Sequence, residues 1–245
     1  MDNGIYIALS KQLALFRQMA VTTNNMANAN TAGFQAEQTV FESYLQPDNN
    51  LGNKNKMAFA NDVSTYRDVQ DGARRVTGNQ LDVALEGVGQ YFMVETPLGT
   101  RYTRAGNFTL DGNGILITPE GYPVLDNSNQ RIEFPQNATN INIGAAGNIS
   151  VNGDDFSSIG VAIFENPQLM TQTASGLYKS EIAPTIGDEE NLKITQGVLE
   201  EANVSPIIEM TRMIEVSRQV ASVAKYIETI NDLQRKTTNT WTQQS

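Results

Sequence analysis

A regular apolar stripe near the C-terminal end, between residues 205 and 234, sets the strongest limit on how this 245-residue chain can fold. Its six residues are spaced alternately by three and four positions, which places them on one side of an α-helix: Met213, Val216, Val220, Val223, Ile227 and Ile230. Ser205 and Pro206 form a helix start signal, because serine caps a first turn and proline is tolerated in it. The stripe predicts a long amphipathic helix that needs a partner, either inside an ordinary domain core or in an assembly.

The first thirty residues predict a second helix, which is apolar on more than one side. One stripe consists of Ile5, Leu9, Leu13, Phe16, Ala20 and Ala27, and the apolar surface is widened by Leu15, Met19 and Met26. Such a helix is either central in a large core or contacted from several directions.

An asparagine-rich segment follows, with Asn24, Asn25, Asn28 and Asn30 within seven residues. Asparagine amides compete for backbone hydrogen bonds, so this composition is poor for a helix interior. Gly33 is a predicted helix C-cap, with Phe34 as the hydrophobic contact beyond it. The segment is either a fraying helix end or a set of amides that hydrogen-bond a neighbouring helix or chain.

Residues 35–74 give a weak signal and predict a linker or extended arm. Phe41, Tyr44 and Leu45 are compatible with an extension of the helix, and residues 47–53 form a turn-rich loop. From residue 81 onward, the chain consists of short alternating runs separated by turns. Two hairpins are predicted, 91–95 with 100–104 and 107–110 with 115–118, followed by strands at 122–125, 131–134, 141–143, 149–151 and 159–164.

This spacing predicts an antiparallel sandwich or barrel-like domain. The predicted fold class is therefore α+β, with a β-rich domain inserted between two helices.

Composition removes most kinds of catalytic site. The chain has no cysteine and no histidine, which excludes thiol nucleophiles, Ser-His-Asp triads and zinc finger clusters. The sequence Asp111-Gly112-Asn113-Gly114 starts like a calcium loop but lacks its later ligands, so we predict a hairpin turn there. We expect no metal, no cofactor, no small-molecule substrate and no enzymatic activity.

Charge and hydropathy exclude two further kinds of partner. A net charge of −10 argues against binding to nucleic acid. We expect no direct membrane insertion, because no stretch is long and apolar enough to span a bilayer. The first 26 residues lack the features of a secretory signal peptide.

One alternative from a different functional class stays open, a glycan-binding or glycan-cleaving β-domain. Two carboxylates are sufficient for glycoside hydrolysis, although Glu200 and Glu201 are more typical of a solvated acidic cluster. A basic and aromatic face for a glycan would be formed by Arg101, Tyr102, Arg104 and Phe108.

Three separated blocks resemble signatures of bacterial flagellar rod and hook proteins. Residues 21–34 resemble A-x-x-N-N-L-A-N-x-N-T-x-G-F, and residues 81–87 and 102–108 are similar to L-D-x-A-x-x-G and Y-T-R-x-G-x-F. Residues 197–204 are similar to the C-terminal signature G-x-L-E-x-S-N-V. Within that family, the opening residues 1–6 look most like proximal rod members, with distal rod members next.

The resemblance implies a structural axial subunit of the basal-body rod, exported by the flagellar type III apparatus without a cleaved signal peptide and assembled helically in the periplasm. Its partners would be other rod proteins and copies of itself. The terminal helices would pair as a coiled-coil-like stem and form an inner tube, with the β domain outside it. The expected domains are an N-terminal helix (1–34), a linker or arm (35–74), a β-rich outer domain (75–198) and a C-terminal helix and tail (199–245).

The expected assembly interface lies on both terminal segments. On the N-terminal side it comprises Ile5, Leu9, Leu13, Phe16, Met19, Asn24, Asn25, Met26, Asn28, Asn30, Gly33 and Phe34. On the C-terminal side it comprises Leu199, Asn203, Val204, Met210, Met213, Val216, Val220, Val223, Ile227 and Ile230. Within one chain, we expect Ile5, Leu9, Leu13 and Phe16 to pack against Met213, Val216, Val220 and Val223.

Overall fold

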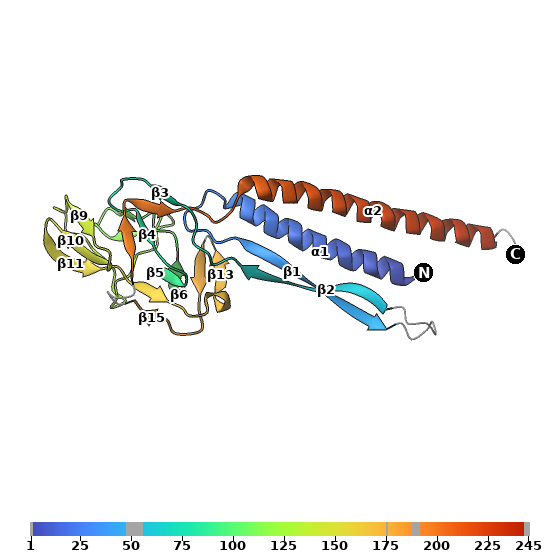
Figure 1. Ribbon diagram of the computed structural model, residues 1–245, viewed down its shortest axis with the longest axis horizontal. Coiled ribbons are helices and arrows are strands. Elements are labelled where there is room, and N and C mark those ends of the chain that lie inside the picture. The colour runs from blue at the N-terminus through green and yellow to red at the C-terminus, as the bar shows by residue number, and fades with distance from the viewer. Residues whose placement is uncertain (1, 48–55, 175, 188–191, 243–245) are drawn as a thin grey trace. The chain divides into compact units, whose positions relative to one another are not determined.

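The computed structural model describes residues 2–47, 56–174, 176–187 and 192–242 (Figure 1). These residues have an α+β fold with a helix near each end and a β-rich part between them, as predicted. They divide into two compact units. The first, here the helical unit, comprises Met1–Ala27, Glu37–Tyr66 and Ser205–Ser245; the second, here the β unit, comprises Asn28–Ala36 and Arg67–Val204.

The helical unit contains two helices that lie side by side and run in opposite directions, α1 (Asp2–Ala27) and α2 (Pro206–Thr242) (Figure 1). Their shared core consists of the buried residues Ala8, Leu15, Val216 and Val223, with the partly buried Met19, Val220 and Ile227 packed against it. Helix α2 begins at the predicted proline and extends beyond the predicted stripe.

Helix α1 ends at Ala27, six residues before the predicted C-cap. Gly33 does adopt a left-handed conformation, with φ of 64°. Gly33 lies in a turn outside the helix, however, because the helix ends earlier, within the asparagine-rich segment. A backbone turn forms there, in which the Thr31 N–H donates to the Asn28 carbonyl at 3.0 Å.

The segment after α1 is a two-stranded sheet of β1 (Glu37–Pro47) and β2 (Lys56–Arg67). Phe41, Tyr44 and Leu45 therefore lie in a strand, and the alternative that they extend the helix is wrong. The physical reason is the share of β-branched and aromatic residues in β1, which favours strand over helix. Residues 48–55, which include most of the predicted turn-rich loop, lie outside the described residues.

The β unit is built on a six-stranded sheet in the order β13-β14-β6-β5-β12-β15. Its strands are β5 (Gln90–Thr96), β6 (Gly99–Thr103), β12 (Val161–Ile163), β13 (Thr171–Ala174), β14 (Leu177–Lys179) and β15 (Thr185–Ile186). The interior strand β5 is buried on both faces: Phe92 and Val94 join one hydrophobic cluster, and Tyr91 and Met93 join another. This explains why its sequence is a continuous apolar run rather than an alternation.

Smaller sheets complete the β unit. A three-stranded sheet has the order β11-β10-β9, and the two-stranded pairs are β16-β4, β17-β3 and β7-β8. The bounds are β3 (Arg74–Val76), β4 (Val83–Leu85), β7 (Thr109–Leu110), β8 (Leu116–Ile117), β9 (Ile141–Ile143), β10 (Asn148–Val151), β11 (Asp154–Ser158), β16 (Ile194–Gln196) and β17 (Val198–Glu200), with a 3-10 helix η1 (Pro167–Leu169). Strand pairing in this unit is antiparallel, as predicted.

Both predicted hairpins are present. Strand β5 pairs with β6, and β7 pairs with β8 across the turn at Asp111. One carboxylate oxygen of Asp111 accepts hydrogen bonds from the backbone N–H groups of Asn113 and Ile115, both at 2.8 Å, which lowers the pKa of Asp111. The acidic side chain therefore holds a turn, as expected from the missing calcium ligands.

The predicted strands at 122–125 and 131–134 are only isolated bridges, such as Val94 with Val124 and Leu125 with Arg131. Among the described residues, no helix has the length and apolar character that crossing a membrane requires.

Candidate functional site

The predicted stripe of α2 is the covered side of that helix. Val216 and Val223 are buried, and the other four members are half-buried: Met213, Val220, Ile227 and Ile230. The stripe contacts α1 through Ala8, Leu15 and Met19.

Helix α1 uses a different side from the one predicted. Leu9, Leu13 and Phe16 are 47%, 57% and 48% exposed, so the prediction that they pack against α2 within one chain is wrong. The side that meets α2 carries Ala8 and Leu15 instead. Because α1 is apolar on several sides, periodicity alone did not determine which side faces α2, and the small side chain of Ala8 suits close helix packing.

Asn25 of the asparagine-rich segment binds the backbone of its own chain. Its amide nitrogen donates to the Glu37 carbonyl at 2.8 Å, and its amide oxygen accepts from the Glu37 N–H at 3.0 Å. Asn25 is 1% exposed. One side chain thus satisfies both backbone groups of the first residue of β1, in the way that a neighbouring strand would. By contrast, Asn24 and Asn30 are exposed.

Asn203, from the C-terminal motif, holds backbone in the β unit in a similar way. Its amide oxygen accepts from the Ala36 N–H at 2.6 Å. Its amide nitrogen donates to the carbonyls of Asp68 at 2.9 Å and Gln70 at 3.0 Å. One asparagine therefore ties together three segments that are distant in sequence.

Gly33 and Phe34 bring the N-terminal motif against the other two motifs. The Gly33 N–H donates to the Glu200 carbonyl at 2.9 Å, and the Asn203 N–H donates to the Phe34 carbonyl at 3.2 Å. A Cβ atom on Gly33 would lie 2.4 Å from the carbonyl carbon of Arg104. Phe34 is 1% exposed. Only glycine permits both the left-handed turn and this close backbone approach.

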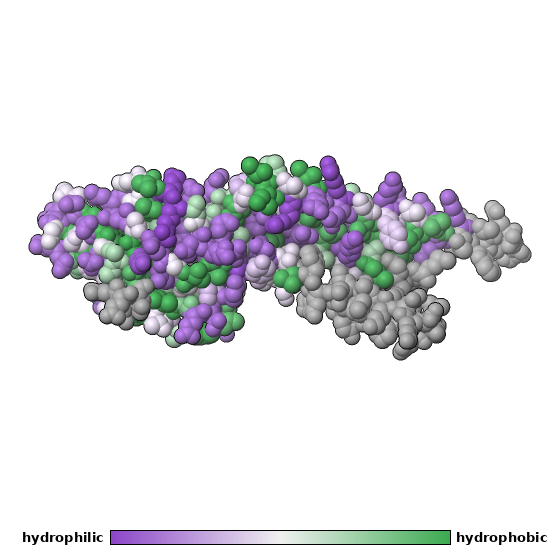
Figure 2. Space-filling view, viewed as in Figure 1, coloured by the Kyte–Doolittle hydropathy of each residue, from purple (hydrophilic) through white to green (hydrophobic). Residues whose placement is uncertain are grey.

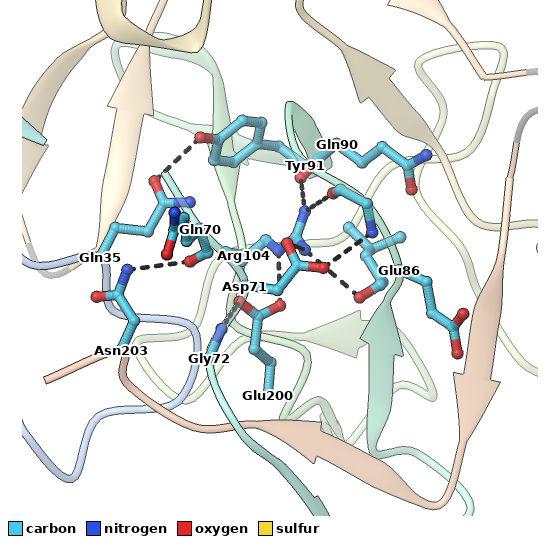
Figure 3. A network of polar contacts seen from close by, with 12 residues as sticks. Gln35, Gln70, Asp71, Gly72, Glu86, Gln90, Tyr91, Arg104, Glu200 and Asn203 are labelled. Carbon is cyan, nitrogen blue, oxygen red and sulfur yellow. Dashed lines mark hydrogen bonds and ion pairs between the residues drawn. The ribbon is translucent and has the colours of Figure 1, made fainter. Parts of the chain in front are cut away.

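Arg104 lies at the centre of a polar network where the three motif blocks meet (Figure 3). Its guanidinium is 1% exposed and donates to a Glu200 carboxylate oxygen at 2.6 Å and to an Asp71 carboxylate oxygen at 2.7 Å. Nη1 also donates to the carbonyls of Gly87 at 2.8 Å and Gln90 at 2.7 Å. A buried arginine is tolerated when its donors are satisfied and its charge is paired, and both conditions hold here.

Burial also perturbs two acidic groups in this network. Burial raises the pKa of Glu200, an effect larger than the opposing influence of Arg104, and the Gly72 N–H donates to Glu200 Oε1 at 3.1 Å. Burial likewise raises the pKa of Tyr91, whose hydroxyl donates to Gln35 Oε1 at 3.0 Å. Both side chains are buried and hydrogen-bonded within the fold, so the network acts as a structural joint.

The predicted basic and aromatic face does not exist. Its four residues are buried, with exposed fractions of 1–9%: Arg101, Tyr102, Arg104 and Phe108. Their side chains are therefore not available at the surface to bind a glycan. Glu200 is also buried, contrary to the prediction of a solvated acidic cluster, whereas Glu201 is exposed and pairs with Arg75 at 2.9 Å.

The remaining predicted interface residues differ in environment. Leu199 is buried, Met26, Asn28 and Val204 are half-buried, and Met210 is 55% exposed. Asp71 and Gln35 are residues of the network that sequence reasoning did not find. The available signal was Arg104 within a conspicuous motif block, since an arginine that is buried requires acidic partners somewhere in the chain.

In the described part of the chain, no group of three or more acidic, histidine or cysteine side chains is arranged to hold a metal ion. What the residues do form is a set of interlocked motifs in the β unit and a pair of helices with apolar residues left exposed. This combination indicates the class of structural proteins that assemble with other subunits.

Comparison with known proteins gives the family. Residues 5–35 match the model of flagella basal body rod proteins, residues 84–151 match the flagellar hook protein FlgE/F/G D1 domain, and residues 195–240 match the C-terminal model of flagellar basal body rod FlgEFG proteins. The chain belongs to the flagellar basal-body rod protein family.

Individual relatives cover nearly the whole chain. It is 33% identical to the flagellar basal-body rod protein FlgF of Caulobacter vibrioides, over 96% of each chain. It is 35% identical to FlgF of Mesorhizobium japonicum over 91% of each chain. It is 30% identical to the flagellar basal-body rod protein FlgG of Bacillus subtilis, over 98% of this chain and 99% of that protein. The relatives and the burial of Arg101 and Arg104 leave the glycan alternative without support.

Proposed function

We propose that this chain is a non-enzymatic axial subunit of the flagellar rod, of the FlgF-like proximal kind, which assembles helically through its terminal helices and transmits torque. The FlgF relatives, at 33% and 35% identity, support this choice. A distal, FlgG-like position is the second candidate, favoured by a FlgG relative that matches 98% of this chain.

The proposal assigns a role to each part of the chain. Residues 1–34 and 199–245 form the inner tube as a coiled-coil-like stem, residues 35–74 form an arm, and residues 75–198 form the outer domain. The partners are copies of this chain, other rod proteins and the type III export apparatus. The chain reaches the periplasm without cleavage of a signal peptide.

The observation that carries the proposal is the exposure of large apolar residues on α1. Leu9, Leu13 and Phe16 are about half exposed in the single chain, and each belongs to the predicted interface with other subunits. Fully burying a side chain of this size is worth about 1.5–3 kcal/mol relative to leaving it exposed. A single chain leaves much of this free energy unrealised, and contact with neighbouring subunits would recover it.

Amide hydrogen exchange tests the proposal. In the dilute monomer, amides of residues 5–27 and 206–234 should exchange quickly, because a helix pair with few buried contacts opens readily. These amides should become protected when the chain polymerises or binds other rod proteins. The interior strands β5 and β6 provide the control, since they should be protected in both states. Full protection of both helices in the monomer would contradict the proposal.

A further inference from the structure

The β unit carries a pocket of about 650 Å³ that is lined by residues of β5, of β11 and of the segment 126–133. This volume lies within the range of protein ligand pockets, about 300–1,000 Å³. None of its described lining residues belongs to the terminal helices or to the polar network around Arg104. At the end of the β unit where Figure 1 labels β9, β10 and β11, Figure 2 shows mostly hydrophilic residues on the visible face.

A bulge in β11 places an aromatic ring in the wall of this pocket. Ser157 of β11 pairs with Ile149 of β10, but the next residue of β10 pairs with Asp155, so Phe156 is the extra residue of a β-bulge. The Phe156 ring stacks on Phe134 with the ring centroids 5.5 Å apart, yet Phe156 is 42% exposed. Because bulges change the direction of a side chain, this one leaves a partly exposed ring at the pocket.

The pocket has an excess of negative charge. Its charged lining residues are Glu95, Asp126, Arg131 and Glu133. Arg131 is held by Glu95, since Nε donates to Oε2 at 2.6 Å and Nη2 donates to Oε1 at 3.1 Å. The hydrogen bond from Arg131 lowers the pKa of Glu95, so this pair stays ionised. Among the described residues, Asp126 and Glu133 form no ion pair.

The charge distribution disfavours contact between two β units at this pocket. The β unit contains 18 acidic and 8 basic residues, which accounts for the whole net charge of −10. Strand β11 is the outer strand of its sheet, and its residues Asp154 and Asp155 are exposed. Pairing of two β11 edges would bring like charges together, which opposes that contact. A basic surface of another protein complements the pocket instead.

We propose that this pocket receives an arginine side chain from a basic segment of a different protein. The planar guanidinium of arginine stacks on aromatic rings and binds a carboxylate with two hydrogen bonds. Phe156 supplies such a ring, and the exposed Glu133, next in sequence to the supporting Phe134, supplies a carboxylate. This inference goes beyond the proposed function, because the terminal helices do not make this contact.

Peptide binding to the full-length chain tests the contact. The probe is a short, fluorescently labelled peptide in which arginine alternates with serine. The control peptide carries citrulline in place of arginine, which keeps the shape of the side chain and removes its charge. Fluorescence anisotropy should show saturable binding of the arginine peptide and binding at least about tenfold weaker for the citrulline peptide. Equal binding of the two peptides would contradict recognition of a guanidinium.

Two variants separate the pocket from general attraction to an acidic protein. Glu133→Lys changes the pocket, and Glu181→Lys makes the same change in charge at an exposed residue outside its lining. Only Glu133→Lys should weaken binding of the arginine peptide, by roughly three- to tenfold. Asp126 is not substituted, because its Oδ1 accepts hydrogen bonds from the N–H groups of Ser128 and Gln130 at 2.8 and 2.7 Å. Equal weakening by both variants would reduce the binding to nonspecific attraction and overturn the proposal.

Phe156→Leu tests the aromatic ring while keeping an apolar side chain over Phe134. It should weaken binding of the arginine peptide about two- to fivefold, the size of a cation–π contact at an exposed site. Unchanged binding in both Phe156→Leu and Glu133→Lys would place the arginine elsewhere. Self-association of the chain that the arginine peptide abolishes would overturn the choice of a different protein. None of these outcomes alters assembly through the terminal helices, so the proposed function is tested separately.

Discussion

At the scale of single residues, Arg104 joins parts of the chain that the sequence separates widely. Its partner Glu200 is 96 residues away and Asp71 is 33 residues away. A buried ion pair adds little stability over a well-packed apolar substitute, but loss of one partner leaves an uncompensated charge. Removing Arg104 alone should therefore destabilise the fold more than replacing the whole ion pair with apolar residues would.

We expect Arg104→Met to lower the free energy of unfolding of the β unit by about 3–5 kcal/mol, because Glu200 would remain buried without its cation. The control is Arg75→Met. Arg75 pairs with Glu201 at 2.9 Å, but the two side chains are 60% and 47% exposed. Its loss should cost less than about 1 kcal/mol. Urea unfolding measures both, and equal small losses would show that the network contributes no special stability.

Tyr91 should make stability depend on pH in the alkaline range. Burial raises its pKa above the ordinary value of 10.0, so the unfolded chain loses this proton first as pH rises. The stability that the neutral hydroxyl contributes is therefore complete below about pH 10 and is lost as pH rises through the folded-state pKa. Comparison with Tyr91→Phe isolates this effect, since phenylalanine does not titrate.

The expected result is that the stability difference between the native chain and Tyr91→Phe shifts against the native chain between pH 9 and about pH 11. Urea unfolding at several pH values measures the difference. Tyr226→Phe serves as the control for the substitution itself, because Tyr226 is 55% exposed. A difference that stays constant across this range would contradict the assignment.

Sequence reasoning located the three motif blocks but not their contacts. Gly33 was predicted to cap the first helix; its φ of 64° is left-handed, but it lies six residues beyond the end of α1, so the C-cap prediction is wrong. Its closeness to Arg104 was not predictable, because contact across the fold depends on how the sheet places the two segments. The burial of Glu200 was missed for the same reason: acidic pairs near a helix start are solvated in most proteins, and only the partner reveals the exception.

At the scale of elements, the two helices show when apolar periodicity is sufficient to predict which side of a helix is covered. Helix α2 has one regular apolar stripe of six residues, and this covered side was predicted residue by residue, from Met213 to Ile230, although Ile208 and Ile214 outside the stripe are also apolar and exposed. Helix α1 is apolar on several sides, so the same reasoning selected Leu9 and Leu13 when Ala8 and Leu15 face α2. An apolar pattern identifies the covered side of a helix where one stripe is longer and more regular than the apolar residues on its other sides.

The start of β1 depends on the side chain of Asn25, which gives a prediction at the element scale. Asn25→Asp keeps the oxygen that accepts from the Glu37 N–H but loses the donor to the Glu37 carbonyl. An unsatisfied buried carbonyl costs about 1–3 kcal/mol, so the helical unit should be destabilised by that amount. Asn30→Asp introduces the same charge at an exposed position and is the control. Thermal unfolding followed by circular dichroism compares the two, and equal effects would contradict the role of Asn25.

At the scale of the whole molecule, the two units differ greatly in buried core. In the described residues, the helix pair shares a cluster of four fully buried hydrophobic residues, whereas the β unit has clusters of eighteen and eight. Since stability follows buried apolar area, the helical unit should open at a lower free energy than the β unit. An assembly subunit benefits from this difference, because helices that open readily as a monomer gain order from their neighbours.

This difference predicts that the monomer unfolds in two steps in urea. Circular dichroism at 222 nm, which reports the helices, should fall at a lower urea concentration than the near-ultraviolet signal of Tyr91, Tyr102 and Tyr178 in the β unit. Leu15→Ala should move only the first step to lower urea, because Leu15 lies in the helix core and is 4% exposed. Phe92→Ala, in the larger core of the β unit, should move only the second. A single transition that both variants shift equally would show that the two units fold as one cooperative structure, and the stability of the helices would then not depend on assembly.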